Sequence, residues 1–279
     1  MLRERLAAGG RVYGLALEGF GHPKWARMFA RLGIDFVFMD NEHNPLDRST
    51  CAWAAQAYAA NAVAPLLRIP EPSAILAAMA LDAGAHGVIA PYVETVEQVR
   101  ALVGAAKYRP LKGAALQRIL LDGEFPSPET APYLERFNAD SVLVIMIESA
   151  EGVARLPELL AVRGVDAVLV GPHDFSVAHG VPEQFDHPTF VAALKEVIRV
   201  CRARGIAIGA HHLAGSSARQ REWIAWGCNF VVLKSDTAFI AEGILDEIGA
   251  LRETLGDGAR MGDAPFPFGT RCAKTDDAW

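Results

Sequence analysis

The chain has 279 residues, 51% of them hydrophobic, and a formal net charge of −6. This length and apolar content suit one large domain such as an α/β barrel, which needs roughly 250 residues, whereas the negative charge argues against a nucleic-acid or anionic-membrane partner. No apolar run approaches the ~20 residues of a membrane span, no secretory signal opens the chain, and the four cysteines lack metal-ligand spacing, so we expect a cytoplasmic protein with reduced thiols.

A short apolar run followed by an amphipathic segment recurs along the chain, and this alternation predicts strands separated by helices. The predicted strands are Val12–Leu17, Asp35–Met39, Ala64–Ile69, Gly87–Val93, Ser141–Ile147, Ala167–Val170, Ile206–Ala210 and Phe230–Leu233. The predicted helices include Lys24–Arg31, Ser73–Ala83, Val96–Ala106, Pro188–Arg204, Ser216–Ala225 and Ala238–Glu253. These units most simply close into a single-domain (β/α)8 TIM barrel. An open doubly wound sheet is the alternative, but no Gly-x-Gly-x-x-Gly follows the first strand.

Two segments depart from this alternation. The connection from Tyr108 to Asp140 is rich in proline and is predicted to hold one short helix around Ala131–Phe137. A connection of that length is usually a lid, an active-site wall or an oligomer contact. The last residues, 256–279, mix glycine, proline and charge without periodicity, so we expect a barrel domain over 1–255 followed by a C-terminal tail.

Ionisable side chains collect where the predicted strands end, which is where a barrel of this kind places its chemistry. The ends carry Glu18, Asp40-Asn41-Glu42-His43, Arg68, Glu148, Gly171-Pro172-His173-Asp174, His211-His212, and Lys234 with Asp236. The interiors of the strands are almost wholly apolar. This sorting of polar from apolar residues predicts an active site at the carboxyl ends of the strands.

Each of these residues has a functional and a structural interpretation. Glu148 and Asp174 could share a divalent cation, because oxygen ligands suit Mg²⁺ or Mn²⁺. Arg68 could hold a substrate carboxylate with its guanidinium, and His43 could transfer a proton near neutral pH. Alternatively, Glu148 could form a salt bridge with Arg68, and His173 could be a hydrogen-bonding loop residue.

Lys234 offers a different chemistry. A lysine at a strand end can form a Schiff base with a ketone, provided that it is a free amine. Asp236 lies two residues away, on the same face of an extended strand, and is expected to keep Lys234 charged. This pairing favours the metal interpretation over the Schiff base.

Five motifs occur in order along the chain, and together they resemble the HpcH/HpaI aldolase family of metal-dependent pyruvate aldolases. The resemblance runs from about Gly14 to Asp236. The motifs are Asp40-Asn41-Glu42-His43, Leu67-Arg68-Ile69-Pro70, Leu81-Asp82-Ala83-Gly84-Ala85, Ile147-Glu148-Ser149 and Gly171-Pro172-His173-Asp174-Phe175-Ser176. The resemblance implies a barrel whose last helix exchanges between subunits, usually in a homo-hexamer.

The resemblance also implies roles for individual residues. Glu148 and Asp174 would be the metal ligands, and Arg68 would hold the pyruvyl carboxylate and steady the enolate oxygen. His43 would be the base at the 4-hydroxyl, with Asp82 as its partner. The segment Gly171-Pro172-His173 would contact the substrate.

The chain departs from the family pattern at three places near this site. Met146 stands where many members have glutamine, Lys112-Gly113-Ala114-Ala115 replaces an Arg-Gly segment, and His173 stands where many have alanine or serine. The resemblance nevertheless implies an aldolase that uses Mg²⁺, Mn²⁺ or Co²⁺ and cleaves a 4-hydroxy-2-oxo acid to pyruvate and an aldehyde. A lyase acting on a CoA thioester and a non-catalytic binding barrel are the alternatives.

Overall fold

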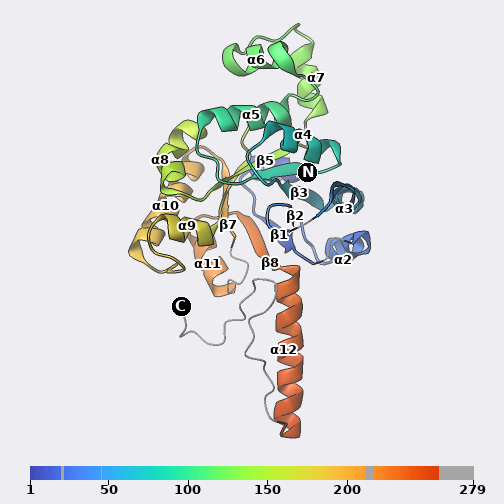
Figure 1. The fold of residues 1–279 in the computed structure, drawn as a ribbon, viewed down its shortest axis with the longest axis vertical. Coiled ribbons are helices and arrows are strands. Elements are labelled where there is room, and N and C mark those ends of the chain that lie inside the picture. The colour runs from blue at the N-terminus through green and yellow to red at the C-terminus, as the bar shows by residue number, and fades with distance from the viewer. Residues whose placement is uncertain (20–21, 45, 212–216, 258–279) are drawn as a thin grey trace.

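Eight parallel strands form the centre of the molecule (Figure 1) in a computed structural model that describes all residues except 20–21, 45, 212–216 and 258–279. The strands are β1 (Val12–Leu17), β2 (Phe36–Asp40), β3 (Ala64–Arg68), β4 (Gly87–Ala90), β5 (Val142–Ile147), β6 (Ala167–Val170), β7 (Ala207–Ala210) and β8 (Phe230–Ser235). They are hydrogen-bonded in the order β7-β6-β5-β4-β3-β2-β1-β8. Asn229 links the two ends of this series, because its backbone N–H donates to Ile208 O and its Oδ1 accepts from Ile208 N. The predicted single-domain (β/α)8 barrel is confirmed.

Helices surround the barrel and separate its strands. They are α1 (Leu2–Ala7), the 3-10 turn η1 (Pro23–Trp25), α2 (Ala26–Arg31), α3 (Arg48–Ala60), α4 (Ala74–Asp82), α5 (Val96–Lys107), α6 (Gly113–Asp122), α7 (Thr130–Phe137), α8 (Ala150–Leu159), α9 (Pro172–Ala178), α10 (Pro188–Ala203), α11 (Ser217–Trp226) and α12 (Asp236–Leu255). Figure 1 shows α12 extending from one end of the molecule and α6 with α7 standing off at the other. Within the described parts of the chain, no helix has the length and apolarity needed to cross a membrane.

The long connection before β5 holds two helices, whereas the sequence predicted one. The expected helix around Ala131–Phe137 corresponds to α7, but α6 was missed. Its signal was the helical spacing of Leu116, Ile119 and Leu120. Leu116 and Leu120 lie directly over Gly104 of α5, where a Cβ would come within 3.0 Å of Leu120, so the missing side chain of Gly104 lets α6 approach.

The barrel interior is filled by every second residue of the strands, as the period of a β-strand requires. The Phe36 and Phe230 rings stack there with centroids 4.5 Å apart. Gly14 makes room for them, because a Cβ at that position would lie 2.2 Å from the Phe36 ring. The remaining buried apolar residues lie between the sheet and the helices, so the core has an inner and an outer layer.

The predicted boundary between barrel and tail falls at the end of α12. Helix α12 ends at Leu255, with Gly256 in the left-handed conformation as its C-cap. Most of the predicted tail, 258–279, lies outside the described residues. The division into 1–255 and 256–279 therefore stays a prediction.

Candidate functional site

The alternation of strand residues carries three polar side chains to the inner, carboxyl-terminal end of the barrel. Asp40 follows the inward-facing Phe38, and it is the register partner of Arg68 on β3. Glu148 follows the inward-facing Met146 by two residues, just after β5. Because period-2 alternation continues past the apolar layer, these side chains point toward a common space.

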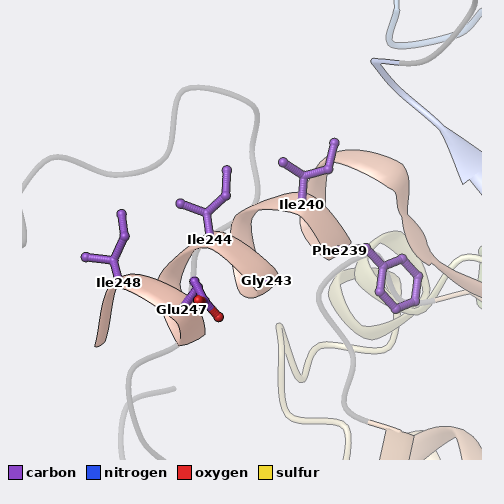
Figure 2. Close-up of a pocket in the computed structure, with 6 residues that line it drawn as sticks. All are labelled: Phe239, Ile240, Gly243, Ile244, Glu247 and Ile248. Atoms are coloured by element: carbon purple, nitrogen blue, oxygen red, sulfur yellow. The ribbon is translucent and has the colours of Figure 1, made fainter. Parts of the chain in front are cut away.

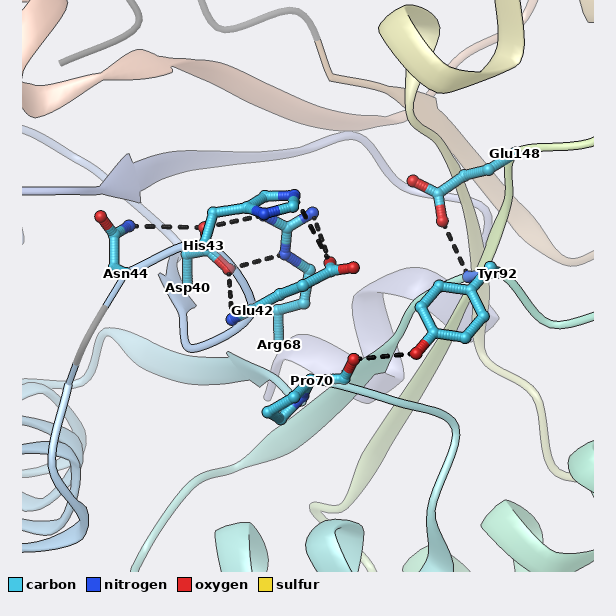
Figure 3. A network of polar contacts seen from close by, with 8 residues as sticks. All are labelled: Asp40, Glu42, His43, Asn44, Arg68, Pro70, Tyr92 and Glu148. Carbon is cyan, nitrogen blue, oxygen red and sulfur yellow. Dashed lines mark hydrogen bonds and ion pairs between the residues drawn. The ribbon is translucent and has the colours of Figure 1, made fainter. Parts of the chain in front are cut away.

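Arg68 is held by two carboxylates that precede His43 in the sequence (Figure 3). Its Nε donates to Asp40 Oδ1 and its Nη2 pairs with Asp40 Oδ2, both at 2.7 Å. Its Nη1 lies 3.0 Å from Glu42 Oε2. The guanidinium also lies over the Phe38 ring, 5.2 Å from its centroid. Arg68 is therefore oriented from several sides before any substrate arrives.

The pKa values of this ion pair follow from its geometry. Burial by itself raises the pKa of Asp40, but the hydrogen bond and the positive charge of Arg68 outweigh it, so the pKa lies below its usual value. Burial likewise opposes the charge of Arg68, and Asp40 more than compensates, so its pKa is raised. Both side chains are therefore charged at neutral pH.

Glu42 lies between Arg68 and His43. Its Oε2 is 3.9 Å from His43 Nε2 and, although it is at ion-pair distance from Arg68, it accepts no hydrogen bond. Burial raises the pKa of Glu42, and the nearby charges of Arg68 and His43 lower it only in part. The His43 side chain is 67% exposed, so it stands at the solvent-facing rim of the site.

Glu148 is a half-buried carboxylate with negative neighbours. Its Oε2 accepts a hydrogen bond from the backbone N–H of Tyr92 at 2.7 Å. Burial raises its pKa to about 7, and the charges of Asp174 and Glu42 contribute to this rise, against the Tyr92 hydrogen bond and the charge of Arg68. In the described parts of the chain, no lysine or arginine forms an ion pair with Glu148 or Asp174.

The segment after β6 borders Glu148 as the sequence predicted. Gly171 precedes α9, and a Cβ there would lie 2.5 Å from Glu148 Oε1, so a larger residue would displace this carboxylate oxygen. Pro172 begins the helix and Asp174 lies in its first turn. His173, the second residue of α9, points to solvent with its side chain 71% exposed and contacts Glu183. Its contact with the substrate stays a prediction.

Asp82 does not meet His43 within one chain. It is the last residue of α4, a helix that starts beyond the carboxyl end of β3 and ends just before β4 begins, so it lies at the opposite end of the barrel. There it accepts a hydrogen bond from Arg109 Nη1 at 3.0 Å. This cation compensates an acid placed at a helix carboxyl end. Its partnership with His43 stays a prediction.

The expected contact between Lys234 and Asp236 is wrong. Strand β8 extends to Ser235, so Asp236 is the first residue of α12 and accepts hydrogen bonds from the backbone N–H groups of Glu18 and Gly19. Lys234 Nζ pairs with Glu242 of α12 instead.

The two histidines after β7 are only partly described. The His211 ring lies 5.3 Å from the Phe38 ring, between centroids, so it is part of the inner packing. His212 lies outside the described residues.

Two residues of this site were not assigned a role from the sequence. Asp40 was noted only as part of its motif, although a strand-end acid in register with a strand-end arginine is a signal for a pair. Tyr92 carried no signal, because the sequence predicted a strand through Val93, whereas β4 ends at Ala90 and Tyr92 turns at φ +35°.

A divalent cation fits the acidic part of the site. Glu148 is half-buried and forms no ion pair with a lysine or arginine of the described residues, the negative charge of Asp174 reaches it, and carboxylate oxygens are the ligands that Mg²⁺ and Mn²⁺ prefer. No group of three or more His, Cys, Asp or Glu side chains arranged for a metal occurs among the residues that the structure describes. Glu148 and Asp174 are the residues that could hold such a cation, and their role as ligands stays a prediction.

Similarity to known proteins covers most of the chain. Residues 17–242 match the HpcH/HpaI aldolase/citrate lyase family. A hydroxypyruvate/pyruvate aldolase from Delftia acidovorans is 32% identical, over 87% of this chain and 89% of the relative. A 2-keto-3-deoxy-L-rhamnonate aldolase from Escherichia coli K12 is 32% identical, over 93% of this chain and 95% of the relative.

A solved structure extends the agreement to three dimensions. The HpcH/HpaI aldolase from Desulfitobacterium hafniense has a TM-score of 0.79 at 26% identity, with 93% of this chain and 99% of that chain covered. The match covers the strands that carry Asp40, Arg68 and Glu148 as well as the segment with Asp174. The chain is a carbon–carbon lyase and belongs to the HpcH/HpaI aldolase/citrate lyase family.

Proposed function

We propose that this protein is a metal-dependent aldolase that cleaves a 4-hydroxy-2-oxo acid to pyruvate and an aldehyde. The observation that carries the proposal is the half-buried Glu148, which forms no ion pair with a lysine or arginine of the described residues and lies within electrostatic reach of Asp174 and of the preorganised Arg68. When bound by Glu148 and Asp174, Mg²⁺, Mn²⁺ or Co²⁺ would supply a Lewis acid for the 2-oxo group. The remaining chemistry is assigned to the residues of the chain.

Arg68 stabilises the charge that develops on the pyruvyl part of the substrate. Asp40 accepts from Nε and from one N–H of Nη2. The N–H groups on the other side of the guanidinium remain for a carboxylate or an enolate oxygen. Because Asp40 and Glu42 already orient the guanidinium, little reorganisation is needed during the reaction. Gly171 and Pro172 would border the substrate where a larger side chain would collide with Glu148.

His43 is the proposed base. His43 takes the proton from the 4-hydroxyl, and the C3–C4 bond then breaks. The electron pair of this bond passes into the enolate while the aldehyde leaves. Protonation of the enolate at C3 then gives pyruvate. The exposed position of His43 suits this role, because the leaving aldehyde needs a path to solvent.

Cleavage of 4-hydroxy-2-oxo acids with and without metal tests the proposal. We expect chelator to abolish activity, added Mg²⁺, Mn²⁺ or Co²⁺ to restore it, and Asp174→Asn to reproduce the effect of chelator. Asp122→Asn, an exposed acid at the end of α6, is the control and should leave activity unchanged. Borohydride with pyruvate should trap no adduct, because Lys234 Nζ is engaged by Glu242 of α12 rather than presented to a ketone.

Two results would contradict the proposal. A reduced adduct on Lys234 together with full activity in chelator would identify a Schiff-base aldolase. Cleavage of a CoA thioester with no activity on any 4-hydroxy-2-oxo acid would identify the alternative lyase. Each result is obtained with the same purified protein.

We also propose that the protein forms a homo-oligomer, a hexamer by analogy with the family, and acts in the cytoplasm. Helix α12 carries an apolar stripe, formed by Phe239, Ile240, Ile244 and Ile248, around a shallow groove (Figure 2). Ile244 is 53% exposed, and an exposed apolar stripe on a projecting helix is typical of a subunit interface.

Light scattering after size-exclusion chromatography tests the assembly. We expect Ile244→Glu to reduce the molar mass of the particle, while Asp246→Asn on the same helix leaves it unchanged. A monomeric wild type at micromolar concentration would contradict the proposal.

A further inference from the structure

Tyr92 adopts an unfavourable backbone conformation directly beside the proposed metal ligand. Its φ is +35°, a backbone conformation that residues other than glycine and asparagine rarely adopt. Strain of this kind persists only where surrounding contacts impose it, and it collects at functional sites. The structure shows which contacts impose it here.

Both ends of Tyr92 are hydrogen-bonded (Figure 3). The backbone N–H donates to Glu148 Oε2 at 2.7 Å, and the phenol hydroxyl donates to Pro70 O at 3.0 Å. The next residue, Val93, donates its backbone N–H to Met146 O on β5 at 3.1 Å. The turn after β4 is therefore fastened to the loop after β3 by the side chain and to β5 by the backbone.

We propose that Tyr92 is a positioning residue that fixes the carboxylate of Glu148 through a backbone N–H held in place by its own hydroxyl. This inference rests on the proposed function, in which Glu148 is a metal ligand. Tyr92 itself is assigned no contact with the reacting atoms.

The geometry at Glu148 explains why one hydrogen bond is sufficient. Its Oε2 accepts from Tyr92, and its Oε1 lies 2.5 Å from the position that a Cβ of Gly171 would take, so a side chain there would displace it. A hydrogen bond from N–H to a carboxylate is short and directional, so it sets the rotation of the carboxylate plane. Groups in the outer shell of a metal site orient its ligands in this way.

The hydroxyl is needed because the backbone of Tyr92 would otherwise relax. A tyrosine at positive φ gains by returning to the β region, and that movement would turn its N–H away from Glu148. The hydrogen bond to Pro70 opposes the movement, since a change of φ at Tyr92 moves its Cβ and carries the phenol away from Pro70 O. Removing the hydroxyl should therefore weaken metal binding although the hydroxyl does not face the metal.

Three substitutions at this position separate the backbone from the ring. Tyr92→Phe keeps the ring and loses the tether. Tyr92→Val loses both, and its β-branched side chain tolerates positive φ least. Tyr92→Asn loses the ring and the tether but accepts positive φ, so its N–H can stay on Glu148. Tyr133→Phe on α7, an exposed tyrosine, is the matched control for removal of a hydroxyl.

The measurement is Mn²⁺ affinity by titration calorimetry of metal-free protein, with kcat and KM for cleavage recorded in parallel and folding checked by thermal melting. We expect Kd to rise about 3- to 10-fold in Tyr92→Phe and about 10- to 30-fold in Tyr92→Val. Tyr92→Asn should bind Mn²⁺ within about 3-fold of wild type. A residue that merely lines the site would not be rescued by asparagine.

Two results would overturn the inference. Wild-type affinity in Tyr92→Phe would show that the tether is irrelevant, and affinity in Tyr92→Asn as weak as in Tyr92→Val would assign the effect to the ring. Glu148→Gln distinguishes these from failure of the proposed function. If Glu148→Gln binds Mn²⁺ like the wild type, Glu148 is not a ligand, and the proposed function fails together with this inference.

Discussion

Replacing Arg68 by methionine should separate the structural from the catalytic part of its role. The Arg68 and Asp40 side chains are only 10% and 9% exposed and are joined by two contacts of 2.7 Å. Removing one partner of such a pair leaves a buried charge and costs about 3–5 kcal/mol. Asp40 keeps the backbone N–H of Glu42 at 2.9 Å, so we expect Arg68→Met to lower the free energy of unfolding by about 3 kcal/mol, the lower end of that range.

A second substitution should recover stability without recovering activity. In Arg68→Met/Asp40→Leu the buried charge of Asp40 is removed and two apolar side chains replace the pair, so most of the lost stability should return, while Glu42 still lacks the Arg68 charge 3.0 Å from its Oε2. Cleavage should remain about 10²–10³-fold slow in both variants, because the preorganised cation is missing. Arg118→Met, on the exposed face of α6, is the control and should change stability by less than about 0.5 kcal/mol.

Urea denaturation at one protein concentration, followed across pH, measures these differences. Folding lowers the pKa of Asp40, so the pair stabilises the protein above the unfolded pKa of about 3.9 and this contribution is lost as pH falls through the folded value. The gap between wild type and Arg68→Met should therefore narrow in acid. Full activity in the double variant would refute the catalytic role, and an unchanged unfolding free energy in Arg68→Met would refute the structural one.

Three further substitutions test the base, a buried ion pair and the packing of the barrel. His43→Ala should lower kcat about 10²–10⁴-fold while changing Mn²⁺ affinity and the exchange of pyruvate methyl protons much less; equal losses in rate and affinity would make His43 a ligand. Lys107→Met should lower the free energy of unfolding by about 2–4 kcal/mol by urea titration, because Lys107 is buried against Asp166, and kcat at 25 °C should not change. Gly14→Ala should prevent folding or lower the thermal midpoint sharply, whereas Gly249→Ala, with no atom near its Cβ position, should leave it unchanged or raise it; similar midpoints for the two would contradict the packing argument.

The sequence was sufficient to predict the barrel and the end of the barrel at which three candidate site residues lie. Apolar runs and amphipathic segments differ in period, and the period depends only on local backbone geometry, so each strand was located before any contact was known. Strand ends follow directly from strand positions. Arg68, Glu148 and Asp174 were therefore assigned to one end of the barrel from the sequence alone, and α6 was missed because its apolar spacing is short and begins at a glycine.

Tertiary structure decided which polar groups meet. Asp40 and Arg68 are 28 residues apart, and Tyr92 and Glu148 are 56 apart, so their contacts depend on strand register and on the turn after β4. No periodicity carries that information. The same limit applies to two other polar side chains. Asp82 was placed by its motif, and it lies at the far end of the barrel. Lys234 was assigned the wrong carboxylate because β8 ends two residues later than predicted. Local propensity determines where an element lies along the chain, whereas the partner of a charged side chain is set by packing between elements that are distant in sequence.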